Sequence, residues 1–464
     1  MKRQLRINSP IHSTHPKNGR DFYFLLGFIV IGLLLRGALL CVMVSHPERA
    51  FWPDTQGYLD PALKLLASGV YPADSAIRTP LYPIFISLVF RIGGENPILI
   101  IIAQVILSTL TVLLTYHLGI RILPRPAALI GALLMAICVE SVTHSLYLLT
   151  ETLFTFLFLA SMLTWVKARQ DSNRSWLVFA ALLMGLCVLC RPIALYFPLL
   201  LVAFHLLDLS RRWSSRLKEV VIYLSILALV LFPWLLRNQL LIGFPSVSTI
   251  SDYNLLFYNA ASLEMHLKGV TEAEIRPELA SRVNQTMANL GWQDTEANRA
   301  RVHRLLARQI ILAHPVRYLY IHLKSDLNSF LPDLAGPAQI LGLTLGGKGT
   351  LSVSNQHGLK AAIRNYFGGS IWPLWVFAPI VALQGLIYMV DAIGIVWLAR
   401  KRAWHPLIVL ILPVMYFMLI PGAPSVPRFR VPVMPNISLL FGLGLNMVWL
   451  ALHRRKSSSG NPLG

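Results

Sequence analysis

The chain has 464 residues, of which 55% are hydrophobic and 13% carry a charge, about half the charged fraction of a typical soluble protein. The mean hydropathy is +0.60, and apolar runs of about 20 residues recur from one end to the other. These features exclude a single soluble domain, a coiled coil, a disordered chain and a disulfide scaffold. They predict an all-α polytopic membrane protein.

In chain order, hydropathy predicts about ten transmembrane helices. The predicted spans are 22–45, 97–120, 126–145, 148–166, 175–190, 192–208, 219–242, 371–399, 405–420 and 431–452. The N-terminus, the C-terminus and the short loops on their side of the membrane hold 20 basic residues and four acids. Lys and Arg in short loops mark the cytoplasmic side. Both termini are therefore predicted to be cytoplasmic, and this topology signal supplies +16 of the net charge of +20, so a nucleic-acid partner is not needed to explain it.

The same topology divides the chain into five segments. They are a basic cytoplasmic N-terminus (1–21), an N-terminal transmembrane module (22–242) with a first outer loop at 47–96, an extracytoplasmic loop region (243–370), C-terminal transmembrane helices (371–452) and a cytoplasmic tail (453–464). The two long polar segments, both outside, hold 14 of the 21 acids. The chain contains no P-loop and no dinucleotide fingerprint. Chemistry is therefore expected on the outer side, without cytosolic nucleotide.

The first outer loop carries the first candidate residue, Asp54, directly after the first span. An amphipathic stretch from Leu59 to Leu66 follows and ends at Gly69, and its apolar face is expected to lie in the membrane interface. Arg78 and the sequence Pro-Leu-Tyr-Pro come next, before an apolar segment at 84–92 that is too short to span the membrane. Asp54 is thus expected at the boundary of water and lipid. A single loop Asp is, however, more often a solvated turn residue.

Charged residues within or at the edges of spans are costly, so they are candidates for function. Six of them are predicted to lie towards the outer face: Glu140, Glu151, Arg191, Arg237, Arg428 and Arg430. Glu140 and Glu151 flank a short outer turn that also contains His144, whereas Arg36 and Asp391 lie deeper. Some of these groups could simply solvate helix ends. Acids and arginines from separate helices on one face nevertheless suggest an anionic ligand there.

Taken together, these segments resemble the polyprenyl-phosphate-sugar-dependent glycosyltransferases of the GT-C fold, which include protein O-mannosyltransferases and the lipid A aminoarabinose transferase. The resemblance begins with Asp54, the interfacial stretch and the Pro-Leu-Tyr-Pro sequence. It continues at Thr150–Phe154, Gly185–Pro192, Arg237-Asn238, Ser248-Thr249, Asn254-Leu255 and Arg428–Pro432 with Pro435. Each motif is weak by itself, but they occur in order over nearly the whole chain. Residues of about 250–360 are too variable to align by eye.

The resemblance implies an inverting transfer of a sugar from a polyprenyl-phosphate donor to an acceptor hydroxyl on the extracytoplasmic face. Asp54 would be the general base, and Glu151 matches the second acid of the family. The leaving phosphate requires guanidinium groups, for which the candidates are Arg191, Arg428 and Arg78, followed by Arg237 and Arg430. Tyr58, Glu140 and His144 are candidates for contacts with the acceptor. The expected partners are this donor, a lipid, glycan or protein acceptor, and membrane lipids.

No cofactor is required by these residues, but members of the resembled family differ in their use of metal. A divalent cation therefore stays open, with Glu151 and His266 as candidate ligands, although a lone loop His is more often ordinary surface. The stretch 296–330 is predicted to be an amphipathic helix leading back to the membrane, with arginines that reach lipid phosphate or, more simply, solvent. The region 243–370 is expected to cap the site.

Two other functions fit parts of the sequence. A transporter or flippase of lipid-linked sugars would also present arginines to a phosphate, but it would place polar residues at the membrane midplane, where Arg36 and Asp391 are nearly the only charges. A surface-polysaccharide ligase or polymerase would use a larger donor in the same chemistry. A bacterial inner membrane is the expected location. The sequence does not identify the sugar, the acceptor or the oligomeric state.

Overall fold

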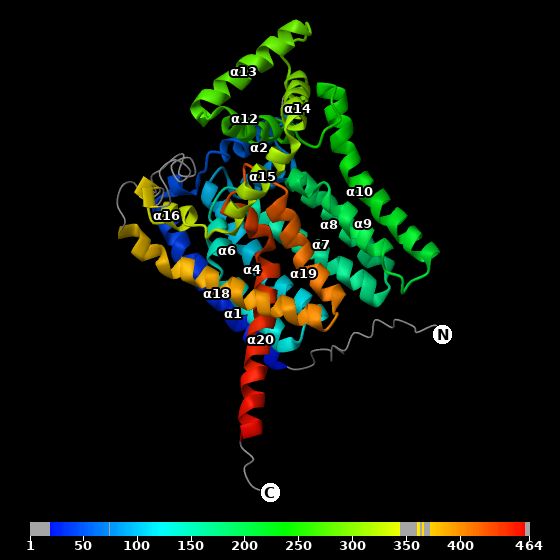
Figure 1. Ribbon diagram of the computed structural model, residues 1–464, viewed down its shortest axis with the longest axis vertical. Helices are drawn as coiled ribbons and strands as arrows, with labels where there is room; N and C mark the ends of the chain where they lie inside the picture. The colour runs from blue at the N-terminus through cyan, green and yellow to red at the C-terminus, as the bar shows by residue number, and fades with distance from the viewer. Residues whose placement is uncertain (1–18, 74, 344–359, 362–363, 366–371, 460–464) are drawn as a thin grey trace.

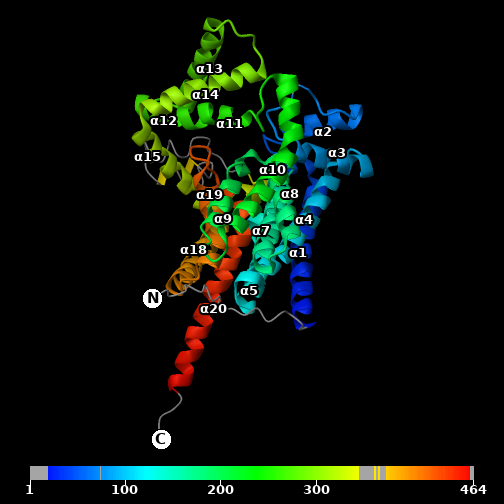
Figure 2. The same cartoon turned by 90° about the vertical axis from the view of Figure 1, so that its right-hand side faces the viewer.

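The computed structural model describes residues 19–73, 75–343, 360–361, 364–365 and 372–459. Every regular element in these ranges is helical, as expected (Figure 1). The predicted segments 1–21, 243–370 and 453–464 lie partly outside the described residues. Two groups of helices make up the structure: a bundle of long apolar helices, and a smaller helical layer over one end, formed by 250–326 and called the cap here (Figures 1 and 2).

Six helices in the described ranges are long and apolar enough to cross a membrane. They are α1 (Gly19–Ser45), α4 (Pro97–Ile122), α7 (Glu151–Asp171), α10 (Trp213–Ile242), α18 (Trp372–Arg400), and η5 (Pro427–Val433) continued by α20 (Met434–Ser459). The chain is thus an integral multi-pass membrane protein. The shorter apolar helices are α3 (Leu81–Gly93), α5 (Arg125–Ile137), α8 (Arg174–Cys190), α9 (Phe197–Leu206, preceded by η2, Pro192–Ala194) and α19 (Trp404–Leu419). Four of the ten predicted spans correspond to these shorter helices, so the count of ten is not confirmed.

The predicted span 126–145 is broken in the structure. The helix α5 stops at Ile137, and a separate short helix, α6 (Val139–His144), follows. The break coincides with the buried side chain of Arg36, which donates to the carbonyl oxygen of Ala136 (2.9 Å) and to the hydroxyl of Ser108 (3.0 Å). A carbonyl at a helix end has no intrahelical partner, so Arg36 satisfies it inside the bundle. This deep charge therefore has a structural role that hydropathy alone does not reveal.

The long C-terminal helix α20 is packed into the centre of the bundle by small residues. It lies against α5 and α18, and a side chain at Gly442 would clash with the backbone of Ala127. A side chain at Gly444 would clash in the same way with the backbone of Val390. Glycines let backbones approach closely where helices have no water to exclude. The close packing holds η5, which directly precedes α20, at the cap end of the bundle.

The first outer loop forms the elements expected from its sequence. A short turn, η1 (Pro47–Ala50), leads to α2 (Gln56–Ser68), which ends at Gly69 in the left-handed conformation (φ = 72°). Glycine enters that conformation at little cost, so it stops the helix. The following helix α3 has 13 residues, about 20 Å, and is too short to cross the bilayer, as predicted.

The cap consists of α11 (Ile250–Asn254), η3 (Leu255–Ala260), α12 (Ala261–Lys268), α13 (Glu272–Asn289), α14 (Glu296–Ala313) and α15 (Pro315–Asp326). It has its own apolar core, which includes Leu256, Ile275, Leu279 and Val302. The single helix predicted at 296–330 is two helices, because Pro315 has no N–H to continue α14 and starts α15 instead. Two short elements, η4 (Leu327–Phe330) and α16 (Ala335–Ile340), return the chain to the bundle.

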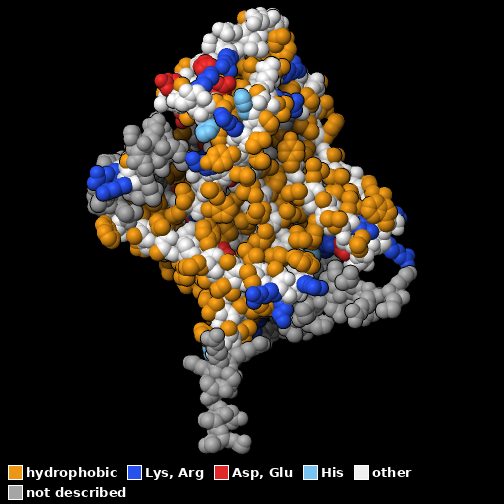
Figure 3. All heavy atoms as spheres, in the orientation of Figure 1, with side chains coloured by type: hydrophobic (Ala, Val, Ile, Leu, Met, Phe, Trp, Pro, Cys, Tyr) orange, Lys and Arg blue, Asp and Glu red, His pale blue; other side chains and the backbone are white. Residues whose placement is uncertain are grey.

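The two ends of the bundle differ in character. Apolar side chains cover the bundle, the cap carries charges of both signs, and basic side chains gather at the lower edge near the end of α18 (Figure 3). The basic residues at this opposite end include Arg169, Arg211, Arg400 and Lys401. The topology predicted from such basic residues, in which the cap end is extracytoplasmic, stays a prediction.

Candidate active site

The loop that carries Asp54 is fixed to the turn in front of α7. The Thr55 hydroxyl donates to the carbonyl oxygen of Leu148 (3.1 Å), and the Leu148 N–H donates to the carbonyl oxygen of Ala50 (3.0 Å). The turn is buried, and polar backbone there needs partners. These bonds bring Asp54 towards Glu151, the first residue of α7, from a distant part of the sequence.

The side chain of Gln104 forms hydrogen bonds with the same turn from inside the bundle. It lies within the span α4, where it is fully buried. Its amide nitrogen donates to the carbonyl oxygens of Ser145 (3.2 Å) and Tyr147 (2.7 Å), and its amide oxygen accepts from the hydroxyl of Tyr82 (2.7 Å). The sequence analysis did not select Gln104, although an amide within an apolar run is the signal that could have found it.

Arg78 reaches the site through its neighbour in the chain. The hydroxyl of Thr79 donates to the carbonyl oxygen of Cys190 (2.8 Å), the last residue of α8. This bond draws Arg78 to the end of α8, where Arg191 follows. Arg428 comes from a third direction, as the second residue of η5. Five separate segments, which carry Asp54, Arg78, Glu151, Arg191 and Arg428, thus meet at the cap end of the bundle.

The five side chains that meet there form one chain of ion pairs. Arg78 Nη2 lies 2.9 Å from Asp54 Oδ1, and Arg428 Nη2 lies 2.7 Å from Asp54 Oδ2. Arg428 Nε is 4.0 Å from Glu151 Oε1, and Arg191 Nη1 is 2.7 Å from the same oxygen. Three guanidinium groups face two carboxylates, so the cluster has an excess of one positive charge. An anion is the ligand that this excess favours.

Exposure orders the cluster from its mouth to its floor. The side chains of Asp54, Arg428 and Arg78 are 28%, 25% and 20% exposed, whereas Arg191 is 11% and Glu151 is 2% exposed. Three buried polar atoms of the cluster have no hydrogen-bond partner among the described residues. One is Arg191 Nη1, which forms the short ion pair with Glu151, and the other two are Glu151 Oε2 and Arg428 Nε. Unsatisfied buried polar groups are rare in native structures. Glu151 Oε2 and Arg428 Nε are thus available to a ligand that enters past Asp54.

The charges around Asp54 set its protonation. Burial alone would raise the pKa of Asp54, but the charges of Arg428 and Arg78 and their hydrogen bonds outweigh it, so the pKa lies below the ordinary value. Asp54 is therefore an ionised carboxylate at neutral pH. Tyr58 lies beside it, and its hydroxyl accepts from Arg78 Nη1 (3.4 Å). Burial raises the pKa of Tyr58, so its hydroxyl keeps its proton.

Aromatic rings lie against all three arginines, and the guanidinium carbon of Arg428 is 5.8 Å from the centre of the Phe429 ring. The guanidinium carbon of Arg78 lies 4.9 Å from the centre of the Tyr58 ring. That of Arg191 lies 5.8 Å from Phe154 and 5.6 Å from Phe429. Cation–π contacts orient a guanidinium without using its N–H donors, so the donors can bind the oxygens of a carboxylate or of another anion.

Arg430 and Glu140 do not belong to this cluster. They form a buried ion pair with each other, and Arg430 also donates to the carbonyl oxygens of Ser329 (3.1 Å) and Leu331 (2.8 Å). Its side chain is fully buried. The prediction that Arg430 binds the donor phosphate, and Glu140 the acceptor, does not fit this placement. Arg430 instead anchors the η5 helix, two residues beyond Arg428.

His144 is also engaged elsewhere. Its Nε2 lies 2.9 Å from Asp333 Oδ2, and both side chains are buried. The neighbouring Tyr147 hydroxyl donates to the carbonyl oxygen of Gly336. A contact of His144 with an acceptor does not fit this pairing. Asp333, which the sequence analysis missed, gives no signal in the sequence, because 189 positions separate it from its partner.

Arg237 binds the loop that contains Pro72 and Ser75 and does not join the cluster of ion pairs around Asp54. Its guanidinium donates to the carbonyl oxygens of Ser75 (3.2 Å) and Pro72 and lies over the rings of Tyr71 and Trp234 (5.4 and 4.7 Å). These contacts fix the chain just before Arg78. The predicted role of Arg237 at the donor phosphate is replaced by support of the segment that leads to Arg78.

The candidate metal ligands do not come together. His266 is exposed on α12, and its neighbour Glu264 is paired with Lys268 (2.6 Å) and Arg282 (3.1 Å). Glu151 is paired with arginine, as described above. No group of three or more His, Cys, Asp or Glu suited to a metal ion occurs in the described ranges. These residues do not fit a divalent cation.

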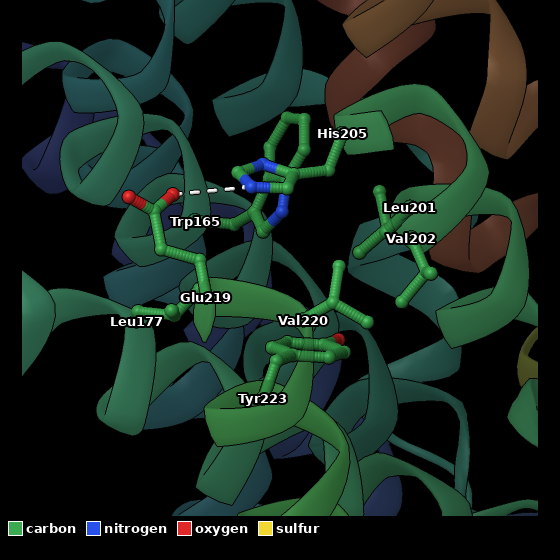
Figure 4. Close-up of a pocket in the computed structure, with 8 residues that line it drawn as sticks. All are labelled: Trp165, Leu177, Leu201, Val202, His205, Glu219, Val220 and Tyr223. Atoms are coloured by element: carbon green, nitrogen blue, oxygen red, sulfur yellow. Dashed lines mark ion pairs between the residues drawn. The ribbon is translucent and has the colours of Figure 1, made fainter. Parts of the chain in front are cut away.

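A small cavity lies at the opposite end of the bundle, between α7, α8, α9 and α10 (Figure 4). It is lined by the side chains of Trp165, His205, Glu219 and Tyr223, among others, and His205 Nε2 lies 3.1 Å from Glu219 Oε2. Its volume is about 10 Å³, which suffices for about one water molecule. It is too small and too far from Asp54 to hold a substrate.

Comparisons with known proteins match the sequence and the fold separately. Residues 77–236 match the sequence model of a family described as dolichyl-phosphate-mannose-protein mannosyltransferase. The match includes Arg78, Glu151 and Arg191 but not Asp54 or Arg428. It covers 160 of the 464 residues. No curated protein sequence matches the chain.

Among solved structures, the apo oligosaccharyltransferase of Archaeoglobus fulgidus matches with a TM-score of 0.53 and 15% identity, over 97% of this chain and 53% of that one. The same enzyme tethered to an acceptor peptide gives 0.51 and 14%, over 97% and 52%. ArnT of Cupriavidus metallidurans bound to undecaprenyl phosphate gives 0.45 and 12%, over 92% and 60%. The chain spans about half the length of the oligosaccharyltransferase. The two oligosaccharyltransferase matches confirm the GT-C fold inferred from the sequence, and the family model over residues 77–236 confirms the resemblance.

Proposed function

We propose that the protein is a membrane glycosyltransferase that moves a sugar from a polyprenyl-phosphate donor to an acceptor hydroxyl at the cap end of the bundle. The observation that carries this proposal is the Asp54 carboxylate held between Arg78 and Arg428 at the mouth of the cluster. A base and an anion-binding pair are the two groups that this transfer needs. The description of the family matched by residues 77–236 supports the donor class.

In the proposed reaction, the donor phosphate binds the guanidinium groups while its isoprenoid tail stays in the bilayer. The acceptor oxygen attacks the anomeric carbon and gives its proton to Asp54. The bond between the anomeric carbon and the phosphate oxygen breaks on the opposite face, so the configuration is inverted. Polyprenyl phosphate leaves with the bonding electrons, and its developing charge is stabilised by Arg428, Arg191 and Arg78.

The arrangement also explains how a weakly basic carboxylate can accept a proton. In the free protein the two arginines hold the pKa of Asp54 below its ordinary value. A phosphate bound to Arg78 and Arg428 competes with Asp54 for these two arginines. The negative charge of the phosphate also lies close to Asp54. Both changes favour protonation of Asp54. Donor binding therefore makes the carboxylate a better base when the acceptor arrives.

The deeper residues are proposed to recognise the donor. The free oxygen of Glu151 lies at the floor of the cluster, where it can accept a hydrogen bond from a sugar hydroxyl. The energy of the reaction is stored in the donor, so no nucleotide is consumed. We place the cap end on the extracytoplasmic face of a bacterial inner membrane, in agreement with the basic residues at the opposite end.

The test is transfer by the purified protein in proteoliposomes. Polyprenyl phosphates that carry different radiolabelled sugars are supplied with an envelope extract as the acceptor. We expect labelled acceptor and free polyprenyl phosphate in equal amounts for one of the donors. We expect Arg428→Gln to lose at least about 100-fold in kcat/KM, by analogy with the loss of one oxyanion donor. Arg299→Gln, in an exposed pair on the cap, is the control and should keep full activity.

The transporter alternative predicts a different result. A flippase would move the intact donor between leaflets without releasing polyprenyl phosphate. Movement without cleavage, with every donor tried, would contradict the proposal. A polysaccharide ligase would cleave only donors that carry a long glycan, and the same assay with such donors distinguishes it.

A further inference from the structure

The position of Arg428 depends on a loop with no regular structure, residues 420–426. This loop, called the 420–426 loop here, connects α19 to η5. Arg428 follows it at the second position of η5, while Arg430 anchors the other side of that helix in the bundle. Displacement of the loop would move the guanidinium group away from Asp54. The contacts that fix the loop therefore bear on the site.

The main contact is with the last residue of α15, Asp326. Its side chain is fully buried, and its Oδ1 accepts two hydrogen bonds from the loop, from the Gly422 N–H (2.8 Å) and the Ser425 hydroxyl (2.7 Å). Hydrogen bonds to a carboxylate are stronger than those between neutral groups. One oxygen atom of Asp326 thus holds two positions in the loop.

Two further cap residues complete the attachment. Asn259 Oδ1 accepts from the Ala423 N–H (3.2 Å), and its Nδ2 donates to the carbonyl oxygen of Pro421 (3.4 Å). His322 Nε2 lies 3.0 Å from the carbonyl oxygen of Leu419. Together with Asp326, these side chains contact the chain from the end of α19 to Ser425. The cap is therefore attached to the bundle directly before Arg428.

The loop also has one position that only glycine suits. Gly422 has φ = +68°, and an added side chain would clash with Asn259 Oδ1 and the His322 ring. Its backbone is thus pressed against the same cap residues that bind it. This close packing is independent evidence that the loop binds the cap in one specific position.

We propose that Asp326 is a positioning residue for the transfer reaction, which holds the 420–426 loop so that Arg428 reaches the donor phosphate. This inference rests on the proposed function only in assigning the phosphate to Arg428. The cap is then part of the catalytic architecture rather than only a cover. Asp326 itself touches neither the donor nor the acceptor.

The first experiment compares variants of Asp326 in the transfer assay. Asp326→Ala removes both hydrogen bonds, and we expect the KM for the donor to rise at least about tenfold, since small displacements of a binding group are costly. Asp326→Asn keeps an acceptor oxygen in the same place and should recover most of this loss. Asp294→Ala, which removes an exposed carboxylate of the cap, is the control and should match the wild type. A variant that lowers kcat alone, with donor KM unchanged, would indicate only a loss of folded protein and would overturn the proposal.

The second experiment is a double-mutant cycle with Arg428. If Asp326 acts through Arg428, then Asp326→Ala should cost less than about twofold in a background that already carries Arg428→Gln. In the Arg78→Gln background, Asp326→Ala should keep its full cost, because the 420–426 loop does not hold Arg78. Equal costs in both backgrounds would contradict the proposed route.

The third measurement does not depend on sugar transfer. Hydrogen exchange at the amides of Gly422 and Ala423 should be at least about tenfold faster in Asp326→Ala, because local opening becomes easier. Ser425→Ala removes only one of the two bonds and serves as the milder variant if Asp326→Ala does not fold. Unchanged exchange would overturn the positioning role even if transfer is found. If the wild-type protein transfers no sugar, the proposed function fails, while the exchange result still decides whether Asp326 holds the loop.

Discussion

Asp54 interacts with the same two arginines that the proposed donor needs, and this sharing governs its chemistry. Each guanidinium lies within 3 Å of one carboxylate oxygen. The protein therefore keeps the base ionised and the anion site partly neutralised until a phosphate enters. The arrangement differs from a simple surface salt bridge, which contributes little, because the pair is more than two-thirds buried and continues to Glu151 and Arg191.

The acid limb of the pH profile reports the pKa of Asp54 in the free protein. Because that pKa is lowered, kcat/KM should stay constant as the pH falls to the ordinary Asp value of about 3.9 and should decline only below it. Arg78→Gln removes one of the two charges that lower the pKa, so the decline should begin at higher pH. The measurement is kcat/KM of both proteins as a function of pH. Identical acid limbs would contradict the assignment of Asp54 as the titrating base.

The pair of Glu151 and Arg191 predicts a separation of stability from activity. Arg191→Met leaves a buried carboxylate with little compensation, which costs about 3–5 kcal/mol. Glu151→Gln in the same protein removes the unpaired charge and should restore most of the thermal stability but not the transfer. Thermal unfolding in detergent checks this, with the exposed Arg299→Met as the control. A double variant as unstable as Arg191→Met would contradict the account.

For single residues, the sequence predicted which ones lie close together but not the direction of each side chain. Asp54, Glu151, Arg78, Arg191 and Arg428 lie together, as the membrane side and the resemblance indicated. Arg430 is only two positions from Arg428, yet it turns into the bundle towards Glu140. Hydropathy gives the depth of a residue but not its rotation about the helix axis. The position of the Arg430 side chain depends on hydrogen bonds to the carbonyl oxygens of Ser329 and Leu331, about 100 positions away in the sequence.

Among the elements, long apolar helices were predicted well and interruptions were not. The span at 126–145 reads as continuous because its composition is apolar throughout, and the break after Ile137 depends on Arg36 from another helix. The break at Pro315, by contrast, has a signal in the sequence, but the prediction of one helix at 296–330 overlooked it. Local signals such as proline and glycine are present in the sequence, whereas a buried side chain that caps a distant carbonyl leaves none.

The helix α15 has two different faces, and the outward face predicts its location. Its exposed side includes Val316, Leu319, Tyr320 and Leu323, which are spaced like one face of a helix. Such a stripe on a helix next to the bundle belongs in the interfacial layer of the bilayer. A spin label at Val316→Cys, with Cys41→Ser, should be accessible to oxygen more than to a water-soluble quencher. A label at Ser281→Cys, exposed on α13, should show the reverse. Preferential access of the water-soluble quencher to both labels would place α15 in water.

For the molecule as a whole, the order of the segments explains why the sequence could predict which residues lie together in the candidate site. The arginines that we propose to bind the donor, and both acids, lie at or near the starts or ends of helices that reach one face of the bundle. The sequence model of the mannosyltransferase family covers only 77–236, so the placement of Asp54 and Arg428 depends on the fold. The cap, whose sequence was too variable to align, contributes the contacts that fix Arg428.

The most direct test of the whole account is a single-turnover measurement with Asp54→Asn. The change removes the base but leaves Arg78, Arg191 and Arg428, so the affinity for undecaprenyl phosphate should be equal or higher. The rate of sugar transfer from the bound donor should fall by about 10²–10⁴-fold, while Asp60→Asn, an exposed carboxylate on α2, should leave it unchanged. Transfer by Asp54→Asn within tenfold of the wild-type rate would contradict the account.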